Sequence, residues 1–133
     1  MRKKPTNLPD TNVILRYLLR DHPEMHRKAA NFFETVRTGD ASALILESVI
    51  VECLYVLTKF YDVPRDRSAA SLQELLNYRG IVNKDRERLI KALDLYAKTS
   101  VDPVDCVLHV KSTPEDRKIF SFDSDLDRLA KED

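Results

Sequence analysis

Four acidic residues stand at the edges of apolar stretches, where a carboxylate is rarely buried without a partner. They are Asp10, Glu52, Asp105 and Asp123. If the fold gathers them on one rim, the four charges repel one another and raise the pKa of some of the acids. A divalent cation removes this repulsion, because Mg²⁺ and Mn²⁺ prefer oxygen ligands from carboxylates, water and phosphate. The pattern therefore predicts a metal-dependent site that acts on phosphodiesters.

Each of these acids also has an ordinary structural explanation. Asp10 suits the N-cap of a helix that starts near residue 12, and Asp123 suits the cap of a helix at the C-terminal end. Glu52 is compatible with an exposed helical face. Asp105 is compatible with a first helical turn, where the helix dipole favours a negative charge. Because all four explanations must hold at once for the site to be absent, we favour a shared site.

The composition indicates an ordinary folded domain. The chain has 133 residues, 43% of them hydrophobic, which predicts one domain, residues 1–133, with a real core. The 22 basic and 22 acidic residues balance, which argues mildly against a plain nucleic-acid-binding module and less against a metal nuclease. No apolar run approaches the ~20 residues of a membrane span. No signal-peptide core follows the basic start, so we expect a cytoplasmic protein without a membrane partner.

The elements that must position the acids are predicted to alternate between strands and helices. Short apolar runs predict strands that end near Asp10 and that span residues 43–46, 80–82 and 119–122. Apolar residues at helical spacing predict helices over residues 12–20, from Pro23 to near Gly39, and over 48–60, 66–78, 84–99, 102–111 and 124–131. This alternation predicts an α/β fold, a small parallel β-sheet flanked by helices.

Such a sheet provides a common rim for the acids. In open α/β sheets, ligands bind outside the carboxyl ends of the strands. Asp10 and Asp123 directly follow predicted strands. Glu52 and Asp105 lie in the first or second turns of helices predicted to begin near the same rim. The predicted topology therefore permits the four acids to meet.

The stretches that carry these acids resemble the motifs of a known family. They are residues 9–18 (PDTNVILRYL), 51–57 (VECLYVL), 102–108 (DPVDCVL) and 120–126 (FSFDSDL). In this order they resemble the four motifs of a PIN domain, especially that of the VapC-type toxins of prokaryotic toxin–antitoxin pairs. The resemblance covers essentially the whole chain.

The resemblance implies a PIN-like fold and an endoribonuclease that depends on Mg²⁺ or Mn²⁺. It also implies an RNA substrate, a homodimer and inhibition by a cognate antitoxin protein. By position, Asp10, Glu52, Asp105 and Asp123 are the catalytic, metal-binding acids. Asp102 competes with Asp105 for the third position. We prefer Asp105, because Asp102 suits a helix N-cap before Pro103.

Further residues are assigned supporting roles around these acids. Thr11 or Asn12 is expected to hydrogen-bond a ligand carboxylate. Ser121 stands where the family usually has Thr, and its hydroxyl can keep the same role. Glu52 either ligates the metal or orients the attacking water as a base. Arg16 and Arg20 are candidates to contact RNA phosphates, although ordinary solvated charges on helix faces are the better explanation for most such residues.

Two competing functions belong to different classes. The first is a PIN-like RNA-binding or RNA-processing module without a toxin role, and the presence of all four acids argues against a loss of catalysis. The second is a receiver-type phosphoacceptor domain, which also collects acids at strand ends. That class needs a late Lys at a strand terminus, whereas the last predicted strand here ends in Phe122 and Asp123.

Overall fold

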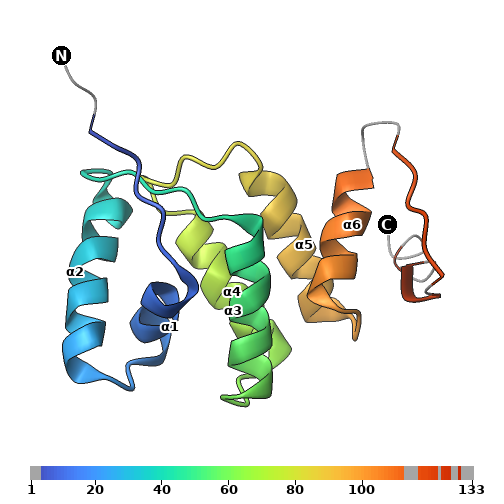
Figure 1. The fold of residues 1–133 in the computed structure, drawn as a ribbon, viewed down its shortest axis with the longest axis horizontal. Coiled ribbons are helices and arrows are strands. Elements are labelled where there is room, and N and C mark those ends of the chain that lie inside the picture. The colour runs from blue at the N-terminus through green and yellow to red at the C-terminus, as the bar shows by residue number, and fades with distance from the viewer. Residues whose placement is uncertain (1–3, 113–116, 123, 127–128, 130–133) are drawn as a thin grey trace.

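The computed structural model describes residues 4–112, 117–122, 124–126 and 129. Within these residues the chain forms helices α1 (Thr11–Leu19), α2 (Pro23–Thr38), α3 (Glu47–Lys59), α4 (Arg65–Leu76), α5 (Arg86–Lys98) and α6 (Pro103–Ser112). In Figure 1, α1 and α2 lie at one end, α3 and α4 in the middle, and α5 and α6 toward the other end. No helix in the described part of the chain is long and apolar enough to cross a membrane.

The predicted α/β fold with a parallel sheet is wrong for the residues that the structure describes. Only isolated parallel bridges occur among them, between Asn7 and Ala43 and between Ala43 and Ile81. Residues 119–122, a predicted strand, form no β-bridge with another described residue, and the Phe120 and Phe122 side chains are 89% and 98% exposed. The architecture is therefore helical, with three short extended segments that lie side by side at Ala43.

Side-chain chemistry explains why the bridges do not grow into a ladder. Beyond the Ala43–Ile81 bridge, Ile45 pairs with the side chain of Asn83 instead of with backbone. The Ile45 N–H donates to Asn83 Oδ1 at 2.9 Å, and Asn83 Nδ2 donates to the Ile45 carbonyl at 2.8 Å. On the other side, Pro9 has no N–H to extend the pairing of the N-terminal segment. Each parallel pairing therefore stops after a single β-bridge.

Gly80 allows these segments to come close together. Its N–H donates to the Val36 carbonyl at 2.7 Å, and its own carbonyl accepts from the Ala43 N–H at 2.9 Å. A Cβ at this position would lie 2.1 Å from the Ala41 carbonyl oxygen. Only glycine therefore fits where the chain returns from α4 to meet the connection between α2 and α3.

The core lies where the helices meet. Five of its best-buried side chains come from five different helices and are at most 2% exposed: Ile14, Phe33, Ile50, Leu72 and Leu93. Each of these side chains lies on the apolar stripe of its helix. The hydrophobic effect therefore favours the helical packing even without a sheet.

Two charged contacts fix α6, which carries Asp105, against its neighbours. Arg65 at the start of α4 donates to the carbonyls of Tyr96 and Val101, at 3.1 and 2.7 Å, and its guanidinium lies 3.6 Å from the centre of the Tyr96 ring. These bonds anchor the connection between α5 and α6. Lys111, near the end of α6, forms an ion pair with Glu47 at the start of α3.

Candidate functional site

Asp10 is the N-cap of α1. Its backbone is extended, with φ −85° and ψ 173°, and its Oδ1 accepts a hydrogen bond from the Val13 N–H at 2.9 Å. The residue is exposed, whereas the preceding Pro9 is buried. The capping role left open by the sequence is therefore real. One carboxylate oxygen makes this cap, and the side chain faces solvent.

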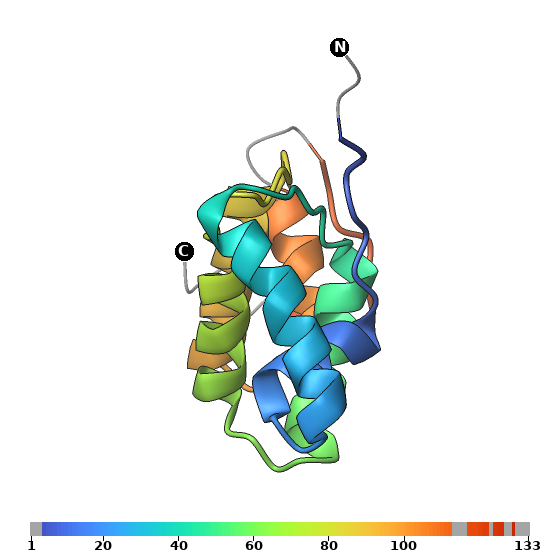
Figure 2. The ribbon, with the colours of Figure 1, turned by 90° about the vertical axis from the view of Figure 1, so that its left-hand side faces the viewer.

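Glu52 lies near Asp10 on the neighbouring helix α3. It is exposed in the second turn, beside the buried Cys53. Burial raises the pKa of the Cys53 thiol to about 12, and the negative charges of Glu52 and Asp10 add to the effect. Both carboxylates are therefore close enough to act on the same sulfur. Figure 2 shows the N-terminal segment that leads into α1 on the same side of the molecule as α3.

Asp105 belongs to a second helix, α6, that packs against α3. It is half-buried in the first turn of α6, whose first helical bond runs from the Cys106 N–H to the Asp102 carbonyl at 3.1 Å. Asp102 thus has the backbone position of an N-cap. Burial raises the pKa of Tyr55 on α3, and the charges of Asp102 and Asp105 raise it further. Tyr55 is one turn beyond Glu52, so the two side chains lie on the same face of α3.

The described residues alone do not form a metal centre. Within them, no group of three or more His, Cys, Asp or Glu side chains is placed to hold a metal ion. Asp10, Glu52 and Asp105 supply the oxygen donors that Mg²⁺ and Mn²⁺ prefer, so the donor chemistry fits. Asp123, the fourth predicted acid, lies outside the described residues. The predicted four-acid cluster therefore stays a prediction.

The predicted supporting residues lie at both ends of the chain. Thr11 is partly buried and Asn12 is exposed, and both are in the first turn of α1 beside Asp10. Ser121 is exposed in the extended segment of residues 117–122. Their proposed hydrogen bonds to ligand carboxylates also stay predictions.

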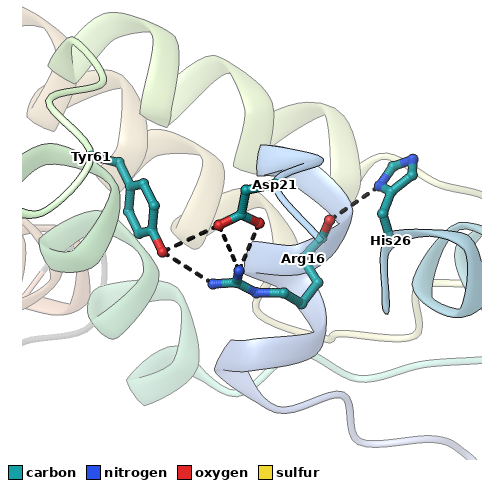
Figure 3. A network of polar contacts seen from close by, with 4 residues as sticks. All are labelled: Arg16, Asp21, His26 and Tyr61. Carbon is teal, nitrogen blue, oxygen red and sulfur yellow. Dashed lines mark hydrogen bonds and ion pairs between the residues drawn. The ribbon is translucent and has the colours of Figure 1, made fainter. Parts of the chain in front are cut away.

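Arg16 belongs to a polar network that the sequence pattern does not reveal (Figure 3). The residue is only 8% exposed. Its Nη1 donates to both carboxylate oxygens of Asp21 at 2.6 Å, its Nη2 donates to the Tyr61 hydroxyl at 3.2 Å, and its carbonyl contacts His26 Nδ1 at 3.1 Å. The Tyr61 hydroxyl also donates to Asp21 at 3.4 Å. The guanidinium thus links α1 to the loop after α3.

Electrostatics within this network favour the ion pair. The hydrogen bond with Tyr61, together with Asp21, raises the pKa of Arg16 against the opposing effect of burial. Burial acts to raise the pKa of Asp21, but the hydrogen bond and charge of Arg16 outweigh it and leave that pKa lowered. Arg20, the other predicted RNA contact, is exposed and ends α1 in the left-handed region with φ 58°.

Comparison with known proteins gives one match. The family model of the PIN domain matches residues 8–132 of the chain. No curated protein and no solved structure matches it. The matched range contains all four predicted acids.

Proposed function

Because the chain belongs to the PIN domain family, we propose that it is a metal-dependent endoribonuclease that hydrolyses RNA phosphodiesters. PIN domains are generally nucleases and generally use divalent metal ions. The observation that carries the proposal is the placement of three motif acids on neighbouring elements. Asp10 precedes α1 and Asp105 lies in the first turn of α6, and both helices pack against α3, which carries Glu52.

In this proposal Asp10, Glu52, Asp105 and Asp123 hold Mg²⁺ or Mn²⁺. When bound, the ion supplies Lewis acidity and makes a bound water easier to deprotonate. The chain itself supplies the ligand oxygens and their orientation. The Val13 N–H holds Asp10 Oδ1 in place. Glu52 is exposed, and in this proposal it either ligates the metal or accepts a proton from the attacking water.

The motif resemblance extends the proposal to a toxin role. A VapC-type toxin would act on RNA in the cytoplasm as a homodimer and would be inhibited by a cognate antitoxin protein. This role predicts a small neighbouring gene whose product binds the protein and suppresses cleavage. Co-expression followed by affinity purification tests it, and the absence of such a gene would favour an RNA-processing nuclease.

Cleavage of total RNA by the purified protein tests the nuclease function. We expect discrete products with Mg²⁺ or Mn²⁺, none with EDTA, and none from the Asp10→Asn variant. Asn caps a helix about as well as Asp, so this variant removes the charge and preserves the start of α1. Metal-independent products, or equal cleavage by wild type and variant, would contradict the proposed site.

The sequence leaves a second candidate, a PIN-type RNA-binding module without catalysis. Titration with Mn²⁺, followed by calorimetry, distinguishes the two candidates. The nuclease predicts saturable binding that is weakened by Asp105→Asn, whereas the binding module predicts RNA binding without a metal site.

A further inference from the structure

A groove beside Asp10 has the chemistry of a nucleotide-binding site. It has a volume of about 530 Å³ and lies between the N-terminal segment, α1 and α2. This volume is within the roughly 300–1,000 Å³ range of small-molecule pockets. The chain passes directly from Pro9, which lines the groove, through Asp10 and Thr11 to Asn12, which lines it as well. A ligand in the groove would therefore lie next to the candidate nuclease acid.

The lining combines an apolar surface with positive charge. Phe32 and Met25 provide apolar surface, and Phe32 is held edge-on to Phe33 with the ring centres 5.0 Å apart. Lys28 adds a cation. Its ion pair with Glu24 is 4.0 Å long with both side chains about three-quarters exposed, which is worth little in water. Lys28 can therefore turn toward a bound phosphate.

The polar groups of the lining are donors or amides. Asn12 offers an amide that can pair with the edge of a base. Arg16 lines the same groove, and its buried Nε–H has no hydrogen-bond partner in the described part of the chain. None of the residues that line the groove in the structure is acidic. This charge pattern favours an anionic ligand that carries a flat apolar ring.

We propose that the groove binds one nucleotide of single-stranded RNA, with its base against Phe32 and Met25 and its phosphate near Lys28. The proposal rests on the proposed nuclease function and defines a substrate subsite for it. Stacking of a base on an aromatic side chain is sequence-tolerant. The groove would thus position the strand at Asp10 without reading a specific sequence.

The test measures binding of a short fluorescein-labelled single-stranded RNA in EDTA, where metal-dependent cleavage is suppressed. Fluorescence anisotropy compares the wild type with Met25→Glu, Phe32→Leu and Phe32→Tyr, and with Lys84→Glu as a charge control on the loop before α5. We expect Met25→Glu and Phe32→Leu to weaken binding by roughly 5- to 150-fold, the range for loss of one stacked base. Phe32→Tyr keeps the ring, so it and Lys84→Glu should bind like the wild type. Circular dichroism checks that each variant folds.

Each outcome separates the groove from the nuclease function. Groove-dependent binding without cleavage by the wild type would support the groove and contradict the nuclease. If Met25→Glu leaves both the RNA affinity and the KM of cleavage unchanged, the groove proposal is overturned and the nuclease function stands. The groove proposal is also overturned if the wild type does not bind RNA. It fails too if the groove variants lose a co-expressed protein partner while keeping RNA, since the groove would then be a protein-docking surface.

Discussion

Replacing Asp10 separates its role as a helix cap from its proposed role in catalysis. Asp10→Ala removes both the hydrogen bond from the Val13 N–H, 2.9 Å long, and the negative charge at the start of α1. Asp10→Asn removes the charge and keeps an oxygen that can accept the same bond. The two variants therefore differ in stability, and both lose the carboxylate that a metal ion would need.

The expected magnitude follows from the geometry of the cap. Loss of an Asp N-cap to Ala costs ~0.5–2 kcal/mol, and Asp10 is exposed, so water can replace the bond and the lower half of the range applies. Loss of the favourable interaction with the helix dipole adds ~0.3–1 kcal/mol. We expect Asp10→Ala to lower the free energy of unfolding by about 1–2 kcal/mol, which is a drop of roughly 3–7 °C in Tm for a chain of this length. Asp10→Asn keeps the cap and loses only the interaction of the charge with the helix dipole, about 0.5 kcal/mol.

Two assays on the same preparations test this reasoning. Urea denaturation followed by circular dichroism gives the free energy of unfolding, and cleavage of RNA in Mg²⁺ or Mn²⁺ gives the activity. We expect the order of stability to be wild type, Asp10→Asn, then Asp10→Ala, with no cleavage by either variant. Wild-type cleavage by Asp10→Asn would mean that Asp10 is only a cap. Equal stability of Asp10→Ala and the wild type would show that the cap contributes nothing.

Three further predictions concern the rest of the fold. Asp21→Asn should destabilise the protein at neutral pH, and the difference from wild type in urea unfolding should shrink as the pH falls below about 4. Arg16 lowers the folded-state pKa of Asp21. The stabilisation by Asp21 is therefore present above its unfolded-state pKa and is lost as the pH falls through its folded-state pKa. Cys53 and Cys106, whose thiol pKa values burial raises to about 12 and about 11, should resist Ellman's reagent at pH 8 in the folded protein and react after unfolding in guanidinium. Gly80→Ala should cost about 3 kcal/mol or more, measured as a fall in Tm, because the new Cβ would meet the Ala41 carbonyl oxygen; an unchanged Tm would contradict this close approach.

The helices could be predicted from the sequence because their signal is local. Apolar residues repeat at helical spacing, and the prediction of a helix over residues 12–20 differs by one residue at each end from α1 (Thr11–Leu19). The sheet was predicted wrongly because a short apolar run such as residues 43–46 is equally compatible with an extended segment that pairs only once. Nothing local in the sequence shows that the Asn83 side chain takes the place of a backbone partner for Ile45.

The candidate site was predictable only in part, for a similar reason. The sequence places Asp10 and Asp105 at helix starts, and the structure confirms these positions. Whether separate helix starts come together depends on tertiary packing, which no local pattern encodes. The partners of Arg16 illustrate the same limit, because Tyr61 is 45 residues away in the sequence. The family match adds what local patterns do not provide, because it spans residues 8–132 as one unit.

The structural and catalytic explanations of these acids do not exclude each other. The N-terminus of a helix carries partial positive charge, so a carboxylate there is attracted to the helix start. Asp10 at the start of α1 and Asp105 in the first turn of α6 both have this position. A cap uses one carboxylate oxygen, as Asp10 Oδ1 does, and a carboxylate has a second oxygen to offer. In the proposed nuclease, the cap therefore orients Asp10 before any cation binds.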